Sequence, residues 1–251
     1  MPNANASDGS WIRRYHPSDK ASARLVCLPH AGGSASYYFP VSAALTPDVE
    51  VLAVQYPGRQ DRRSEPCFTT ITDLADAVVA ELDAWRDLPL VLFGHSMGAT
   101  LGYEVARRLE RAGGPPQALF ASGRRAPSTH RDERIHTLDD EGIVDELRKL
   151  DGTHGAVLDD PELREMFLPV IRGDYTAVET YVHVPGTELS CPIHVLLGED
   201  DPRASLDEAE AWAGHTDGEF SLTTFTGGHF YLDDHRDEVV SLVTERIAQL
   251  A

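Results

Sequence analysis

The chain has 251 residues, of which 41% are hydrophobic and 25% are charged, proportions typical of a soluble globular protein that can bury a substantial core. Its formal net charge of -19 repels nucleic acid and anionic membranes, which argues against a nucleic-acid-binding protein. No apolar run approaches the roughly 18 residues that a membrane span requires, so we expect neither a nucleic-acid nor a membrane partner.

The N-terminus and the cysteines bear on location. The first 16 residues contain no apolar segment of the kind found in secretory signals, and we expect residues 1–10 to be disordered. Cys27, Cys67 and Cys191 are an odd number of cysteines without metal-type spacing. We therefore expect a reduced, cytoplasmic protein, monomeric and without a metal or organic cofactor.

Predicted strands and helices alternate along the first half of the chain. Apolar runs predict strands over residues 24–28, 49–55, 88–93 and 117–122. Between them, helical patterns cover residues 35–46, 70–86 and 100–112. This order predicts a parallel sheet that is covered by helices on both faces.

The alternation stops between residues 123 and 186, where two helical patterns, 138–150 and 161–181, occur without a convincing strand. It then resumes with a strand, a helix, a strand and a helix over residues 192–197, 206–213, 220–225 and 234–250. A helical insertion on the side of the sheet where an active site must lie is typical of a lid. A capping subdomain without a gating role is the alternative.

The most informative stretch is Gly94-His95-Ser96-Met97-Gly98, because it lies between the predicted strand 88–93 and the predicted helix 100–112. Gly-x-Ser-x-Gly in that context is the nucleophile-elbow motif. The sharp turn exposes the serine hydroxyl, and the flanking glycines leave room for it. Ser96 is the candidate nucleophile, and the Met97 N–H is a candidate oxyanion donor. The alternative is a glycine-rich turn with an idle serine.

A serine nucleophile needs a base that is oriented by a carboxylate, and the elbow motif places them later in the chain, acid before histidine. After the predicted strand 192–197 the chain reads Gly-Glu-Asp-Asp-Pro, and after the strand 220–225 it reads Thr-Gly-Gly-His-Phe. We assign His229 as the base. Among the acids we choose Asp201, with Asp200 as the alternative.

A second oxyanion donor is expected from the loop after an early strand. His30-Ala31-Gly32-Gly33 follows the predicted strand 24–28, and its glycines permit a close approach of the backbone to a ligand. We assign the Ala31 N–H to this role. The alternative is a plain glycine turn.

Several segments together resemble one family. They are Leu-Pro-His-Ala-Gly-Gly-Ser at 28–34, Gln-Tyr-Pro-Gly-Arg at 55–59, Phe-Gly-His-Ser-Met-Gly-Ala at 93–99, Phe-x-x-x-Ile-Arg-Gly-Asp-Tyr at 167–175, Gly-Glu-Asp-Asp at 198–201 and Gly-Gly-His-Phe at 227–230. From about residue 11 to the C-terminus the chain resembles the type II thioesterases, the stand-alone editing enzymes of polyketide and nonribosomal peptide synthases.

The resemblance implies an α/β-hydrolase fold: a mostly parallel central sheet flanked by helices, with a helical lid at about 123–186, in one domain of residues 1–251. It implies a Ser96–His229–Asp201 triad acting on acyl groups held as thioesters on the phosphopantetheine arm of an acyl or peptidyl carrier protein. A carboxylester hydrolase or a product-offloading thioesterase is the alternative, and a non-catalytic binding module is a third hypothesis.

Two further sets of residues follow from this hypothesis. Carrier proteins of this kind are typically acidic, so docking onto a chain of net charge -19 needs local positive charge. The candidates for docking are Arg59, Arg62 and Arg63 in one cluster, and Arg124, Arg125, Arg131 and Arg134 in another; solvated or internally paired arginines are the alternative. Phe167, Ile171 and Tyr175 are candidates to line an acyl channel, unless they pack the lid onto the body.

Overall fold

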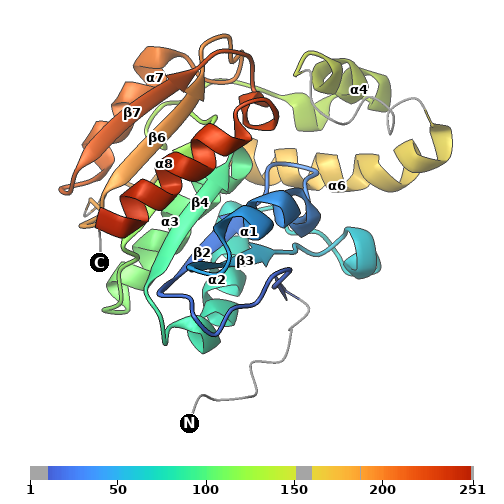
Figure 1. The fold of residues 1–251 in the computed structure, drawn as a ribbon. Coiled ribbons are helices and arrows are strands. Elements are labelled where there is room, and N and C mark those ends of the chain that lie inside the picture. The colour runs from blue at the N-terminus through green and yellow to red at the C-terminus, as the bar shows by residue number, and fades with distance from the viewer. Residues whose placement is uncertain (1–10, 151–159, 187, 250–251) are drawn as a thin grey trace.

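The computed structural model describes residues 11–150, 160–186 and 188–249 (Figure 1). A sheet of seven strands lies at its centre, in the order β1-β3-β2-β4-β5-β6-β7. The strands are β1 (Ile12–Arg13), β2 (Ala23–Leu28), β3 (Val49–Val54), β4 (Leu90–His95), β5 (Ala118–Ser122), β6 (Ile193–Gly198) and β7 (Phe220–Phe225). The predicted disorder of residues 1–10 lies outside the described residues.

Every neighbouring pair in the sheet is parallel except β1 with β3. The predicted mostly parallel sheet is therefore confirmed. β1 was not predicted, because a strand of two residues is too short to show an alternating pattern. It also pairs antiparallel at the sheet edge, so no crossover helix in the sequence indicates its presence.

Helices cover both faces of the sheet (Figure 1). The α-helices are α1 (Phe39–Leu45), α2 (Ile71–Leu82), α3 (Met97–Arg111), α4 (Asp140–Arg148), α6 (Pro161–Glu179), α7 (Leu206–Glu210) and α8 (Arg236–Gln249). Short 3-10 helices are η1 (Ala35–Tyr38), η2 (Gln60–Arg62), η3 (Asp83–Trp85), η4 (Ile135–Thr137), η5 (Ala211–His215) and η6 (Tyr231–Asp233). The predicted helix over 35–46 divides into η1 and α1 because Pro40 lies in the first turn of α1, where its missing N–H costs nothing.

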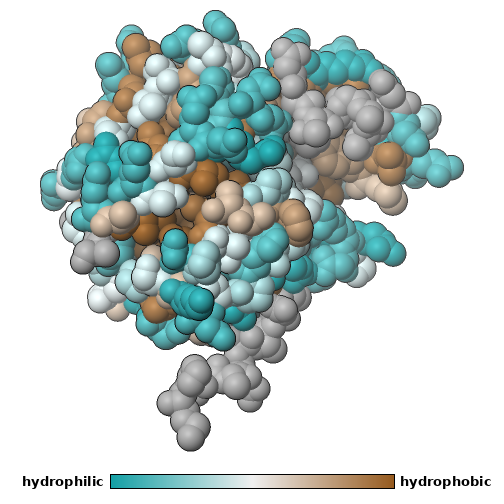
Figure 2. All heavy atoms as spheres, viewed as in Figure 1, coloured by the Kyte–Doolittle hydropathy of each residue, from teal (hydrophilic) through white to brown (hydrophobic). Residues whose placement is uncertain are grey.

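Two apolar clusters fill the space between the sheet and its helices. Along β2, Val26 and Leu28 belong to the cluster that includes α2 and α3, whereas Leu25 and Cys27 belong to the cluster that includes α1 and α8. Alternate residues of a strand face opposite sides of the sheet, so both faces of the central strands are buried. On the α1 and α8 face, apolar residues gather between these two helices (Figure 2).

The insertion between β5 and β6 contains η4, α4 and α6 and no strand among its described residues. Its helices lie beside the sheet rather than on either face (Figure 1). They share a small apolar cluster of their own, whose buried members are Ile135, Ile143, Val144, Leu147, Leu168 and Ile171. The insertion thus has little core of its own and depends on contacts with the body. Within the described ranges, none of the helices is long and apolar enough to cross a membrane.

Candidate active site

The turn from β4 into α3 holds Ser96 in a strained conformation. Its φ of 56° lies in the left-handed region, which side chains other than glycine rarely adopt. A Cβ on Gly94 would lie 2.0 Å from the carbonyl oxygen of Gly98, and one on Gly98 would lie 2.0 Å from that of Leu28. Both positions therefore require glycine. Because Ser96 is itself the cap, α3 begins at Met97, three residues earlier than predicted.

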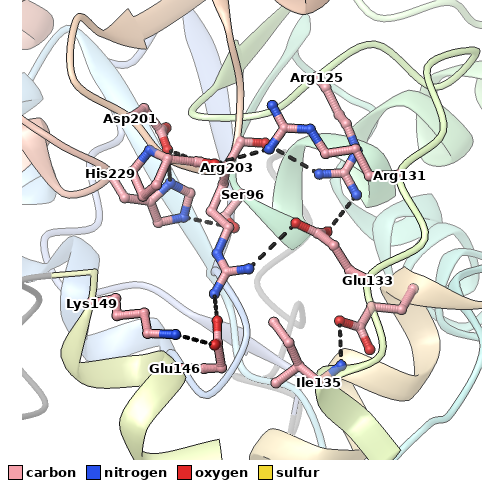
Figure 3. A network of polar contacts seen from close by, with 12 residues as sticks. Ser96, Arg125, Arg131, Glu133, Ile135, Glu146, Lys149, Asp201, Arg203 and His229 are labelled. Carbon is pink, nitrogen blue, oxygen red and sulfur yellow. Dashed lines mark hydrogen bonds and ion pairs between the residues drawn. The ribbon is translucent and has the colours of Figure 1, made fainter.

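Three side chains form a connected chain at the carboxyl ends of β4, β6 and β7. The Oγ of Ser96 lies 2.9 Å from Nε2 of His229, and Nδ1 of His229 lies 2.9 Å from Oδ2 of Asp201 (Figure 3). His229 and Asp201 are buried. Asp200, the alternative acid, is exposed. A hydroxyl, an imidazole and a carboxylate in this order can activate the hydroxyl as a nucleophile.

Glycines let the loop that carries His229 approach the loop that carries Asp201. A Cβ on Gly198 would lie 2.2 Å from the carbonyl oxygen of Gly228, and Gly227 has a φ of 107°. The N–H of Asp200 donates to the carbonyl of Gly227 at 2.9 Å. Backbone contacts therefore fix the distance between the imidazole and the carboxylate.

A buried polar group supports the ring of His229 from behind. The ring of His95 lies 5.0 Å from it between centroids, and Nδ1 of His95 lies 2.9 Å from Oγ of Ser122. That hydroxyl in turn lies 2.6 Å from the hydroxyl of Tyr231. Burial, together with the nearby His229 and His30, holds the pKa of His95 well below its usual 6.5. His95 is therefore a neutral packing residue. Sequence reasoning missed Ser122 and Tyr231, which carry no motif.

The N–H groups of Met97 and Ala31, the two predicted oxyanion donors, have no hydrogen-bond partner in the described part of the chain. The neighbouring Gly32 has a φ of 74°, and its N–H donates to Oδ2 of Asp174 at 2.7 Å. The loop after β2 is thus held by Gly32, its first glycine, while the N–H of Ala31 stays available. Two free donors near a nucleophile are what an oxyanion requires.

Asp174 lies on α6 and joins the insertion to this loop. Its carboxylate pairs with the guanidinium of Arg59 through two contacts of 2.9 Å, and both side chains are buried. Arg59 also donates to the carbonyl of Gly33 at 3.0 Å. One buried ion pair therefore holds α6, the loop after β3 and the loop after β2 together. The sequence showed Arg59 and Asp174 only as parts of separate motifs.

The insertion also contacts the loop of the carboxylate. Arg203, two residues after Asp201, donates its backbone N–H to Asp201 at 2.8 Å. Its guanidinium lies 3.4 Å from Glu133 and 3.0 Å from Glu146, both of the insertion (Figure 3). Sequence reasoning missed Arg203, because nothing in its own segment indicates these partners.

The structure corrects the docking prediction for four arginines. Arg59, Arg62, Arg124 and Arg125 are buried. Arg62 pairs with Glu65 and Arg125 with Glu133. A guanidinium enclosed by the protein cannot meet a carrier protein, so internal roles prevail for these four.

The remaining docking candidates differ in exposure. Arg131 pairs with Glu208, and Arg134 is exposed but pairs with Asp132. Arg63 is exposed. It lines a cavity of 1090 Å³ that also includes His30, Gly32 and Phe167. Of the predicted cationic residues, Arg63 alone therefore combines exposure with a place on a cavity beside the oxyanion loop.

The three candidates for the acyl channel also differ in where their side chains lie. Phe167 lines the 1090 Å³ cavity. Ile171 is fully buried in the apolar cluster of the insertion, and its side chain lies against Gly32. Tyr175 packs against both this cluster and the main core. The last two therefore pack the insertion onto the body, as the alternative interpretation held.

Comparison with known proteins gives consistent results. The Thioesterase domain family model matches residues 23–247. A probable cadicidin biosynthesis thioesterase of Streptomyces griseus is 52% identical over 247 residues, which cover 98% of this chain and 68% of that protein. Thioesterase PikA5 of Streptomyces venezuelae is 49% identical over 245 residues, 97% of this chain and 87% of that protein.

Solved structures agree. The type II thioesterase BorB from the borrelidin biosynthetic cluster superimposes with a TM-score of 0.89 at 54% identity, covering 94% of this chain and 97% of that one. YbtT, a type II thioesterase from the yersiniabactin pathway, gives a TM-score of 0.87 at 30% identity, covering 96% and 99%.

Proposed function

The chain belongs to the thioesterase family, and from that premise we propose that it is a serine hydrolase which releases acyl groups from carrier proteins of polyketide or nonribosomal peptide synthases. Its relatives are type II thioesterases of such pathways, and the family hydrolyses thioesters. The observation that carries the proposal is the contact chain from Ser96 through His229 to Asp201 beside two available N–H groups.

In the proposed reaction the hydroxyl of Ser96 attacks the thioester carbonyl while Nε2 of His229 accepts its proton. Asp201, bonded to Nδ1, holds the imidazole in the required tautomer and stabilises the imidazolium that forms. The N–H groups of Met97 and Ala31 donate to the oxyanion. The carbon–sulfur bond then breaks, the imidazolium of His229 gives its proton to the departing sulfur, and the neutral imidazole activates the water that hydrolyses the acyl-enzyme. A thiol with a pKa near 8.5, by analogy with cysteine, leaves with less help from an acid than an alkoxide does.

We propose an editing role, the removal of stalled or misprimed acyl groups, because BorB and YbtT, both named type II thioesterases, match this chain along nearly their whole length. The partner in this proposal is an acyl or peptidyl carrier protein. With the other arginines buried or paired, Arg63 is the proposed contact for the acidic carrier. Its place on the cavity beside the loop of residues 30–33 would bring the pantetheine arm toward Ala31.

The experiment compares thiol release from a short acyl-pantetheine thioester with cleavage of its oxygen ester, for the wild type and Ser96→Ala. We expect thiol release by the wild type, its loss in Ser96→Ala and much slower cleavage of the oxygen ester. Faster cleavage of the oxygen ester would indicate a carboxylester hydrolase. If the folded wild type cleaves neither compound, the catalytic proposal fails and a binding module remains.

A further inference from the structure

A second cavity lies beside the first turn of α3. The 1090 Å³ cavity borders the loops after β2 and β3, whereas this one, of 300 Å³, lies between the segment after β5 and the C-terminal end of α6. Since β4 runs between β2 and β5 in the sheet, the two cavities lie at segments that follow the strands on either side of β4, the strand that leads to Ser96. Polar residues on the lining of the smaller cavity include Thr100, Arg124, Glu179 and His183.

The guanidinium of Arg124 has no paired carboxylate among the described residues. The residue is 8% exposed, and its Nε donates to Oγ1 of Thr100 at 3.2 Å. Its two terminal nitrogens have no hydrogen-bond or ion-pair partner in the part of the chain that the structure describes. Since the residue lines the cavity, these groups are available to a molecule within it.

The acidic side chains close to Arg124 are engaged elsewhere. Glu133 pairs with Arg125 at 2.6 Å and with Arg203 at 3.4 Å. Glu179, on the cavity lining, accepts the backbone N–H of Ile135 at 3.1 Å and contacts the ring of His136 at 2.5 Å. Burial, reinforced by the charge of Arg125, lowers the pKa of Arg124 to about 10, so the side chain remains a cation at neutral pH.

A buried cation without a counterion is costly, and proteins keep such groups where they serve a site. A guanidinium presents its N–H groups in a planar fork that fits the two oxygens of a carboxylate. His183 also lies on the lining of this cavity. The cavity is therefore prepared for an anion.

The position of Thr100 relates this cavity to the reaction. Thr100 lies in the first turn of α3, the helix that Ser96 caps, and the N–H of Ser96 donates at 2.8 Å to the carbonyl of Ser122, two residues before Arg124. The bond from Arg124 to Thr100 thus brings the guanidinium within one helical turn of the nucleophile. A thioester bound at Ser96 has two arms, the thiol and the acyl group, and the two cavities lie at segments on either side of β4.

We propose that the 300 Å³ cavity binds a free carboxylate at the far end of the acyl group, with Arg124 as its principal partner. This inference rests on the proposed thioesterase function and adds a substrate class to it, the monothioesters of dicarboxylic acids. Arg124 is then a residue for substrate selection, in place of the carrier docking that the sequence suggested.

The test uses pantetheine thioesters of dicarboxylic acids of four to six carbons, each paired with the neutral compound in which the free carboxylate is an amide. For each pair, the ratio of kcat/KM values is measured in the wild type, Arg124→Met, Arg124→Lys and the control Arg246→Gln, a residue of α8 that pairs with Glu219. We expect Arg124→Met to lower the carboxylate-to-amide ratio about 10- to 100-fold, the range for charge-assisted hydrogen bonds. Arg124→Lys, which keeps the charge but lacks the fork, should lower it less, and the control should leave it unchanged.

Three outcomes overturn the inference. An unchanged ratio in Arg124→Met is the first. The second does not need a folded Arg124→Met: it is equal affinity of Ser96→Ala for the carboxylate thioester and for its amide partner in a direct binding measurement. The third is a fall in kcat/KM of Arg124→Met that occurs only when the thiol arm carries its phosphate. This result would show that the cavity binds that phosphate instead of an acyl carboxylate. If the wild type cleaves the amide compounds, the thioesterase proposal stands whatever the ratio.

Discussion

The body and the insertion both contribute to the site, but they are held in different ways. In the body, Ser96, Asp201 and His229 follow three parallel strands whose ladders fix where each strand ends. The insertion has a small apolar cluster, and ion pairs such as Arg59–Asp174 and Arg203–Glu146 join it to the body. Strand ends place side chains through backbone bonds, whereas the insertion is held by contacts between side chains, both apolar and ionic.

This difference has a consequence for catalysis. Substitutions of Ser96, Asp201 or His229 should change the chemistry and leave the fold intact, because backbone bonds of the sheet maintain the geometry. Substitutions at the joins should change stability and activity together, because Asp174 both pairs with Arg59 and accepts the N–H of Gly32. Substitutions at the triad and at the contacts between the insertion and the body test this difference.

The largest effect is expected in the body, from Asp201→Asn. The asparagine can no longer hold the His229 ring in the tautomer that accepts the serine proton, and loss of this role lowers kcat by about 10⁴-fold in serine hydrolases. Steady-state kinetics on a short acyl-pantetheine measures it, with thermal unfolding expected to change little. Asp200→Asn is the matched control, because that exposed residue should tolerate the change. A greater loss in Asp200→Asn than in Asp201→Asn would reverse the assignment.

A smaller effect on kcat, but a larger one on stability, is expected from Asp174→Ala. Removal of one partner of a buried ion pair costs about 3–5 kcal/mol, and release of Gly32 should lower kcat about 10- to 100-fold by loosening the adjacent oxyanion donor. Denaturant unfolding and kinetics measure the two effects.

Asp140→Ala provides the control for Asp174→Ala, since Asp140 forms an exposed pair of the insertion with Arg172 and should cost less than about 1 kcal/mol. The double variant Arg59→Met with Asp174→Leu should regain stability without regaining kcat. Full recovery of kcat in that double variant would show that the pair has no part in positioning the loop.

A several-fold effect is expected from Arg63→Glu with a carrier-bound substrate. Reversal of one exposed charge at a docking surface weakens association with an acidic partner, by an amount that falls as salt screens it. Turnover of acyl-carrier protein at low and high salt measures this effect, and turnover of the free pantetheine thioester provides the comparison. Arg134→Glu is the matched exposed control. Equal losses in the two variants would show that Arg63 has no special position.

The smallest effect concerns a histidine where the insertion meets the body. His215 lies 2.8 Å from the hydroxyl of Ser128 and 3.2 Å from that of Tyr103. Burial, with the nearby His183, lowers its pKa from 6.5 to about 4. Between pH 6.5 and pH 4, His215 binds a proton in the unfolded chain but not in the folded one, and this favours unfolding. Its contribution to stability is therefore present above pH 6.5 and is lost as the pH falls toward 4.

The measurement for His215 is the free energy of unfolding between pH 7 and pH 4. His215→Asn should reduce the pH dependence of that free energy by an amount that corresponds to the binding of up to one proton on unfolding. The substitution also lowers the free energy of unfolding at neutral pH. His194, whose pKa burial also lowers to about 4, keeps part of the slope in this variant. An unchanged slope would show that His215 does not titrate in this range.

Much of the body could be predicted from the sequence, because its signals are local. The Gly-x-Ser-x-Gly turn requires glycines that are adjacent to the serine, and the late loops show Asp201 and His229 directly after apolar strands. The order of these elements was enough to bring the three side chains to one edge of a parallel sheet.

The arginines show what only the tertiary structure decided. Arg59 and Asp174 are 115 positions apart, and nothing within either segment reveals that they form a buried pair. Arg124 is enclosed by residues from α3, the segment after β5 and α6, so its burial depends on the packing of the whole fold. A charged side chain looks the same in sequence whether solvent, a distant carboxylate or an empty cavity surrounds it. Its role follows from its surroundings, and those exist only after the chain has folded.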